Sequence, residues 1–122
     1  MATTTVKEGD KVNITIKKGT TYEHVFIYVD ENGVPIDITG YGARMQIRET
    51  VTSAAYVYQA LSGGDLNIGG VNGELGLSIP YSVTAAFSFT SGVYDIELIT
   101  PTGKVVGFVG VSRVKTTPEI TR

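Results

Sequence analysis

Acid–base chemistry at neutral pH would depend on very few side chains of this sequence. The chain has a single histidine, His24, and no cysteine, so no thiol nucleophile or thiolate metal ligand is available to work beside the imidazole. Asp95 and Glu97 lie two residues apart within an alternating segment, which places both on one face of a strand. Two carboxylates that work together need different environments that separate their pKa values. We therefore interpret His24 as a packed or interface residue and the two carboxylates as solvated.

Ion and phosphate sites are equally weakly indicated. The tetrapeptide at 30–33, Asp-Glu-Asn-Gly, resembles part of a calcium loop, but the D-x-[DN]-x-[DN]-G spacing is absent and Thr39 stands where the bidentate glutamate would be. The glycine pairs at 63–64 and 69–70 lack the lysine and hydroxyl residue of a phosphate-binding loop. We interpret all three as turns and predict no catalytic residue, no metal ligand and no cofactor.

Aromatic side chains are more informative, because seven tyrosines occur in 122 residues. Aromatic residues serve both cores and protein interfaces. Residues 22–29 are apolar on both faces, as in a covered central strand or a strand with one face against another chain. Two of the tyrosines, at 56 and 58, would form a sugar-stacking platform if both were exposed. The interface candidates are Tyr22, His24, Phe26, Tyr28, Tyr56 and Tyr58.

Composition favours one folded domain. The hydrophobic share is 42% and the charged share 18%, which is ordinary for a globular chain. The formal net charge of −2 gives no reason to expect nucleic acid or an anionic membrane as a partner. The first residues lack the charged and apolar regions of a secretory signal, and no apolar run approaches the ~20 residues of a membrane helix.

Short strands must position these side chains. Residues 43–48, Ala-Arg-Met-Gln-Ile-Arg, alternate strictly, which indicates a strand with one dry face and one wet face. The other segments predicted to be strands are 12–16, 22–29, 56–61, 66–68, 74–79, 94–98 and 105–114. In the last segment, Val109 and Val111 would share a face. Turn residues such as Asn32-Gly33 separate the segments, so we predict an all-β fold, an antiparallel β-sandwich of about seven to eight strands.

The sequence also suggests where the domain begins and ends. Residues 1–10 are polar and mixed, and we predict an N-terminal arm that is loose unless a partner holds it. The sandwich domain would cover 11–115, and residues 116–122 would form an extended C-terminal tail. One helical turn is expected within 81–87, capped by Ser82.

Several segments, taken in order, resemble a known group of proteins. They are residues 12–19, 22–26, 30–41, 43–48, 92–98, 101–103 and 118–122. The most specific piece is the turn at Asn32-Gly33 and then Pro35, followed by Asp-Ile-Thr-Gly-Tyr at 37–41 and by residues 43–48. In this order the segments resemble small virion structural proteins of tailed bacteriophages and the N-terminal immunoglobulin-like domain of phage baseplate upper proteins.

The resemblance implies an immunoglobulin-like sandwich in a non-enzymatic structural protein of the virion, made in the bacterial host cytoplasm. Such proteins assemble in many symmetric copies with other virion proteins, at a tail tip, baseplate or collar. Baseplate upper proteins continue into a receptor-binding scaffold, whereas this sequence ends at Arg122, so we expect a standalone collar or decoration subunit. The alternatives are a capsid decoration or head-fibre protein, and a module that binds glycans on the host surface.

Overall fold

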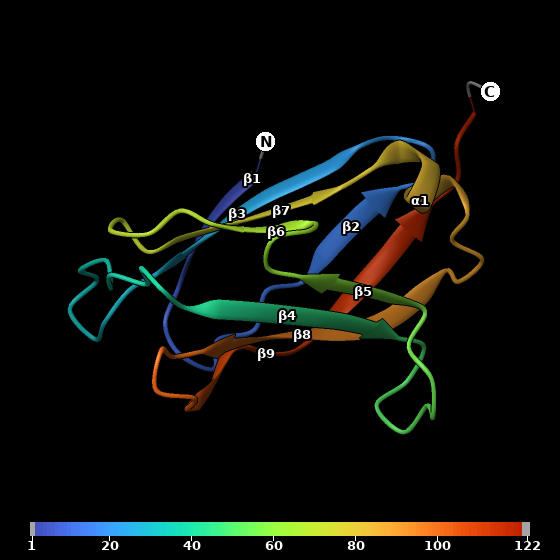
Figure 1. Ribbon diagram of the computed structural model, residues 1–122. Helices are drawn as coiled ribbons and strands as arrows, with labels where there is room; N and C mark the ends of the chain where they lie inside the picture. Colours follow the sequence, from blue (N-terminus) through green and yellow to red (C-terminus); the bar gives the residue numbers. More distant parts are fainter. Residues whose placement is uncertain (1, 121–122) are drawn as a thin grey trace.

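The computed structural model describes residues 2–120 and is a sandwich of two β-sheets (Figure 1). The elements of the described residues are β1 (Ala2–Val6), β2 (Ile14–Lys17), β3 (Tyr22–Tyr28), β4 (Gly42–Arg48), β5 (Tyr58–Leu61), β6 (Leu66–Ile68), β7 (Glu74–Ile79), α1 (Tyr81–Ala85), β8 (Ser91–Ile99) and β9 (Val105–Thr117). One sheet has the order β1-β3-β7-β6 and the other β2-β9-β8-β4-β5. The predicted all-β sandwich is therefore confirmed. Residues 2–120 form nine strands, one more than the upper end of the predicted range.

The strand order matches that of immunoglobulin-like sandwiches. With β3 taken as strand B, the two sheets read B-E-D and G-F-C-C′, the arrangement of a variable-type domain. Strand β2 pairs in parallel with β9. Strand β1 pairs in parallel with β3. All other pairs between neighbouring strands of residues 2–120 are antiparallel.

The extra strand is β1, at the edge of the four-stranded sheet. The sequence predicted a loose arm over residues 1–10, which is wrong for 2–6, because Ala2–Val6 pairs in parallel with β3. Val6 is fully buried. The three threonines between Ala2 and Val6 are β-branched, a residue type that is enriched in strands. A polar segment shows no alternation of apolar and polar residues, so the sequence pattern did not predict a strand here. The segment forms a strand because it pairs with β3. Met1 lies outside the described residues.

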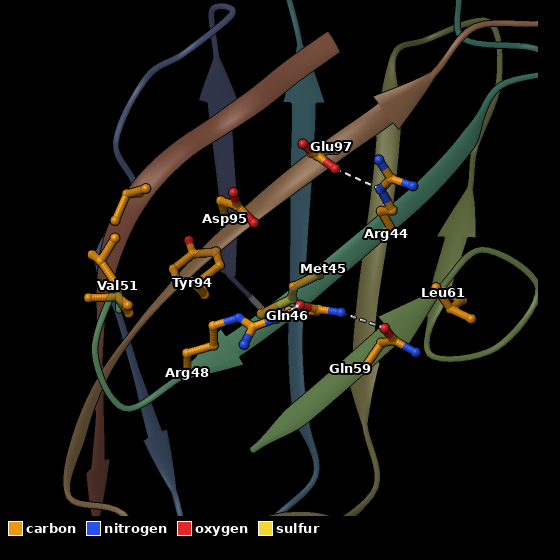
Figure 2. Close-up of a pocket in the computed structure, with 12 residues that line it drawn as sticks. Arg44, Met45, Gln46, Arg48, Val51, Gln59, Leu61, Tyr94, Asp95 and Glu97 are labelled. Atoms are coloured by element: carbon orange, nitrogen blue, oxygen red, sulfur yellow. Dashed lines mark hydrogen bonds and ion pairs between the residues drawn. The ribbon is translucent and has the colours of Figure 1, made fainter. Parts of the chain in front are cut away.

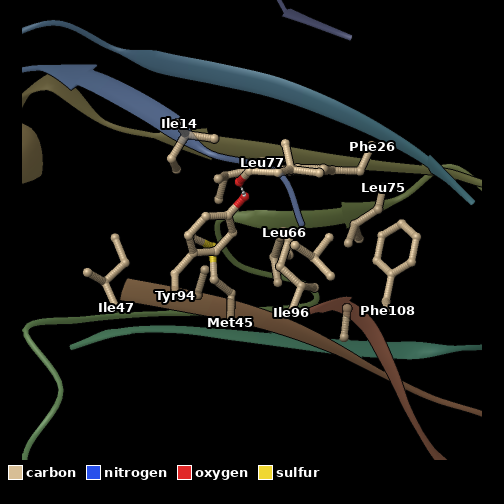
Figure 3. Close-up of a cluster of buried hydrophobic side chains, with 14 of the residues drawn as sticks. Ile14, Phe26, Met45, Ile47, Leu66, Leu75, Leu77, Tyr94, Ile96 and Phe108 are labelled. Carbon is tan, nitrogen blue, oxygen red and sulfur yellow. Dashed lines mark hydrogen bonds between the residues drawn. The ribbon is translucent and has the colours of Figure 1, made fainter. Parts of the chain in front are cut away.

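The core lies between the two sheets (Figure 3). Phe26 and Leu77 contribute from the four-stranded sheet, and Met45, Tyr94 and Ile96 from the five-stranded sheet. These residues alternate with exposed or half-exposed neighbours along each strand, which is the pattern that packs two inner faces together. The strands predicted at 43–48 and 74–79 follow this alternation as expected.

Two predictions at the end of the sandwich need correction. The helix α1 begins after Pro80 and has no side-chain cap, so Ser82 lies within the helix and does not cap it. The predicted tail over 116–122 is also wrong at its start, because β9 continues to Thr117 and Thr116 donates its hydroxyl to the carbonyl of Phe89. Residues 121 and 122 lie outside the described residues. No helix among residues 2–120 has the length and apolar character needed to cross a bilayer.

Candidate functional site

The interface candidates are mostly core residues. His24, Phe26, Tyr28 and Tyr58 are buried between the sheets, so in the folded chain they are not available as an interface. Tyr22 is half-buried against the core, and Tyr56 is 48% exposed. Strand β3 is central in its sheet, with β1 along one edge and β7 along the other. On its outer face, Val25 and Ile27 are half-buried.

His24 makes hydrogen bonds that connect β1 to β3. Its Nε2 lies 2.8 Å from the Thr4 hydroxyl of β1, and its Nδ1 lies 2.9 Å from the Tyr22 hydroxyl. The ring stacks on Phe26 with centroids 4.3 Å apart. Burial lowers the pKa of His24, because desolvation disfavours the charged imidazolium. The imidazole thus joins β1 to β3 in its neutral form, as the packed interpretation predicted.

The turn at 30–33 is also explained without an ion. Asp30 Oδ1 accepts hydrogen bonds from the backbone N–H of Asn32 (2.9 Å) and of Val34 (3.0 Å). Gly33 has φ +80°, a backbone region that glycine enters without steric penalty. No group of three or more metal-ligating side chains is found among residues 2–120.

The exposed large hydrophobic residues that lie on strands, among residues 2–120, are all on the outer face of the five-stranded sheet. Leu61 of β5 and Val105 and Val111 of β9 are each about half exposed. Val51, in the loop after β4, is 67% exposed and borders the same surface. On the strands of the four-stranded sheet no large hydrophobic residue reaches this exposure.

This outer face holds a groove of about 640 Å³, open to solvent and floored by β4 and β8 (Figure 2). Five of its polar side chains form one hydrogen-bonded pair and one hydrogen-bonded group of three. The Arg44 guanidinium donates through Nε to Glu97 Oε1 at 2.6 Å. The Gln46 side chain donates to Gln59 Oε1 at 2.7 Å and accepts from Arg48 Nη2 at 2.8 Å. The groove therefore has a polar, mixed-charge floor and apolar residues at its borders.

Asp95 stands out in the groove. Burial, and to a lesser degree the nearby Glu97 carboxylate, raise the pKa of Asp95, while Arg44 and Arg48 oppose the shift. Within residues 2–120 no protein group hydrogen-bonds to its carboxylate. The sequence correctly placed Asp95 and Glu97 on one polar face, but it could not show that this face lies beside a row of arginine and glutamine from β4. The sequence feature that could have indicated this arrangement is a pair of polar strand faces with opposite charge, one at 44–48 and one at 95–97.

Comparisons with known proteins bear on the fold. No protein-family model matches the sequence, and no curated protein sequence matches it. Among solved structures, the N-terminal domain of phage TP901-1 ORF48 is similar. It superposes with a TM-score of 0.59 at 9% sequence identity, over 95% of this chain and 98% of that chain. The two chains share a fold.

Proposed function

We propose that this protein is a non-enzymatic structural component of a bacteriophage virion, at a tail tip, baseplate or collar, where several copies assemble with other virion proteins. It would be made in the cytoplasm of the bacterial host and incorporated into the particle. The observation that carries the proposal is the fold shared with a phage domain over nearly the full length of both chains. The order of segments that resembles phage virion proteins points in the same direction.

The surface of the sandwich supports an assembly role. The apolar residues Leu61, Val105 and Val111 lie on one sheet face, where they would be covered by a neighbouring subunit. The edge strands β1, β6, β2 and β5 each have one neighbour, and such edges bind further chains through backbone hydrogen bonds. A subunit that must contact several neighbours needs both kinds of surface.

The groove chemistry favours binding over catalysis. Its charged side chains are two arginines and two carboxylates, and the Arg44–Glu97 ion pair already occupies one of each. No groove residue described here pairs a nucleophile with a general base, the arrangement that covalent catalysis requires. The glycan alternative is also disfavoured, because the hydroxyl of Tyr58 donates to Asp65 and its ring packs on Phe87. Tyr56 is thus left without its stacking partner.

Particle composition tests the proposal directly. Antibodies raised against the purified chain are used to probe density-purified phage particles from the strain that encodes it, with mass spectrometry of the particle proteins as a second readout. We expect the protein in the particles at a fixed copy number. Its absence from intact particles would contradict the proposal, and immunogold labelling of head or tail would distinguish the baseplate or collar position from capsid decoration.

A further inference from the structure

One row of residues crosses four strands of the outer face of the five-stranded sheet. The strand register places Gly107 opposite Glu97, Glu97 opposite Arg44, and Arg44 opposite Leu61. Residues paired in this way point to the same face of a sheet. From β9 to β5, the row therefore consists of a glycine, an acidic residue, a basic residue and a large apolar residue.

Each member of this row is accessible. The side chains of Arg44 and Glu97 are 51% and 35% exposed, and Leu61 is 49% exposed. A Cβ placed on Gly107 would have no heavy atom within 4 Å, so the sheet leaves open space beside the acidic residue. The row therefore offers a projecting side chain at one end and a vacant position at the other.

We propose that a second copy of this chain docks on this face through a two-fold axis that runs parallel to the strands, between β8 and β4. Rotation about this axis places β4 of one copy over β8 of the other, and β5 over β9. Arg44 then faces the second copy's Glu97, and Leu61 enters the space beside the second copy's Gly107. The row is its own complement when reversed, which is the condition that a two-fold contact imposes on a surface.

The adjacent row agrees with the same axis. Asp95 is opposite Gln46, and Gln46 is opposite Gln59. In the docked pair, the Asp95 carboxylate, which has no hydrogen-bond partner among residues 2–120, faces the amide of the second copy's Gln46. A foreign partner would need charges arranged to match both rows, whereas a second copy supplies them by symmetry. The inference deepens the proposed function, on which it rests, by naming the chain itself as the first partner of the groove face.

Charge reversal in mixed samples tests the contact. In sedimentation velocity at low salt we expect the wild-type chain at twice its 13.0 kDa mass. Arg44→Glu and Glu97→Arg should each weaken self-association at least about tenfold, because each creates two like-charge contacts across the axis. An equimolar mixture of the two variants should recover the dimer, since every reversed charge then meets an opposite one. Gly107→Leu, which fills the vacant position, should also give monomers.

Controls separate the contact from folding and from the proposed function. Glu23→Arg reverses an exposed charge on β3, in the other sheet, and should leave the dimer intact. Circular dichroism should show all variants folded, because exposed ion pairs contribute little to stability. A monomeric wild type, or a mixture that fails to recover the dimer, would overturn the two-fold contact. A monomer that is still present in phage particles would overturn this contact alone, whereas a dimer absent from particles would support the contact and contradict the proposed function.

Discussion

The hydroxyl of Tyr94 on β8 donates a hydrogen bond to the carbonyl of Val12, 82 residues earlier in the chain. The N–H of Val12 donates to Ser112 Oγ on β9 at 2.9 Å. Both backbone groups of Val12 are therefore satisfied by side chains of the five-stranded sheet. This is the segment in which the chain passes from β1, in one sheet, to β2, in the other. Two buried hydroxyls thus fix the crossing between sheets.

Replacing Tyr94 by phenylalanine should destabilise the fold by about 1–3 kcal/mol, because the buried Val12 carbonyl loses its donor. Urea unfolding followed by circular dichroism measures the change. Tyr81→Phe is the matched control, since Tyr81 is 64% exposed and should change stability very little. Equal effects of the two variants would show that the Tyr94 hydroxyl does not stabilise the crossing.

Gly110→Ala tests the close contact between β9 and Gly9, which lies in the same segment between β1 and β2. A Cβ at Gly110 would lie 2.7 Å from the carbonyl oxygen of Gly9, a contact that requires the crossing backbone to move. We expect a loss of roughly 1–3 kcal/mol, typical of overpacking. Gly107→Ala, on the same strand in open space, should be nearly neutral in the same unfolding experiment, and a similar loss there would point to β9 in general rather than to the close approach.

Phe26→Ala separates core from interface. Phe26 is fully buried, stacks on His24 and meets Phe108 edge-on with centroids 6.4 Å apart. The change should cost about 3–5 kcal/mol in unfolding free energy, as for other large-to-small core substitutions. Val111→Ala on the exposed groove border should cost less than ~0.5 kcal/mol. A Phe26 variant of unchanged stability but weaker association would restore the interface interpretation of this residue.

His24 should make stability fall in mildly acidic solution. Because burial lowers the pKa of His24 below its ordinary value of 6.5, the unfolded chain binds this proton first, and stability decreases as pH falls from 6.5 towards the folded pKa. Below the folded pKa this contribution is constant. Unfolding curves at several pH values for wild type and His24→Gln should diverge in this window, with the wild type showing the steeper decrease. Parallel curves would exclude His24 as the source.

Alkaline solution should destabilise the fold from about pH 10 upward. Burial raises the pKa of Tyr22 to about 12, and burial also raises the pKa values of Tyr58 and Tyr94, with the hydrogen bond to Asp65 adding to the shift at Tyr58. The unfolded chain therefore loses these protons at lower pH than the folded chain, which favours unfolding. The tyrosinate absorbance of the folded protein should reach its full value at a higher pH than that of the chain unfolded in urea. Completion at the same pH in both states would contradict this.

Local alternation predicted much of the sandwich. The strands at 43–48 and 74–79 agree with β4 and β7, and the Asn32-Gly33 turn occurs as expected. At β9 the same rule failed. The register with β8 shifts around Ile96, so Phe108 and Val109 are both buried and Val109 does not share a face with Val111. A bulge inserts a residue that the period of two cannot anticipate.

The sequence by itself determined which segments become most of the strands and which side of most of them is apolar, because side-chain direction in a strand alternates with every residue. Tertiary structure alone decided that the polar residues 2–6 complete a sheet, that the apolar segment 22–29 is covered on both edges, and that Gly107, Glu97, Arg44 and Leu61 form one row. Those relationships join residues far apart in the chain. They depend on which strands pair and in what register, and each of these strands had several partners compatible with its pattern until the whole sandwich closed.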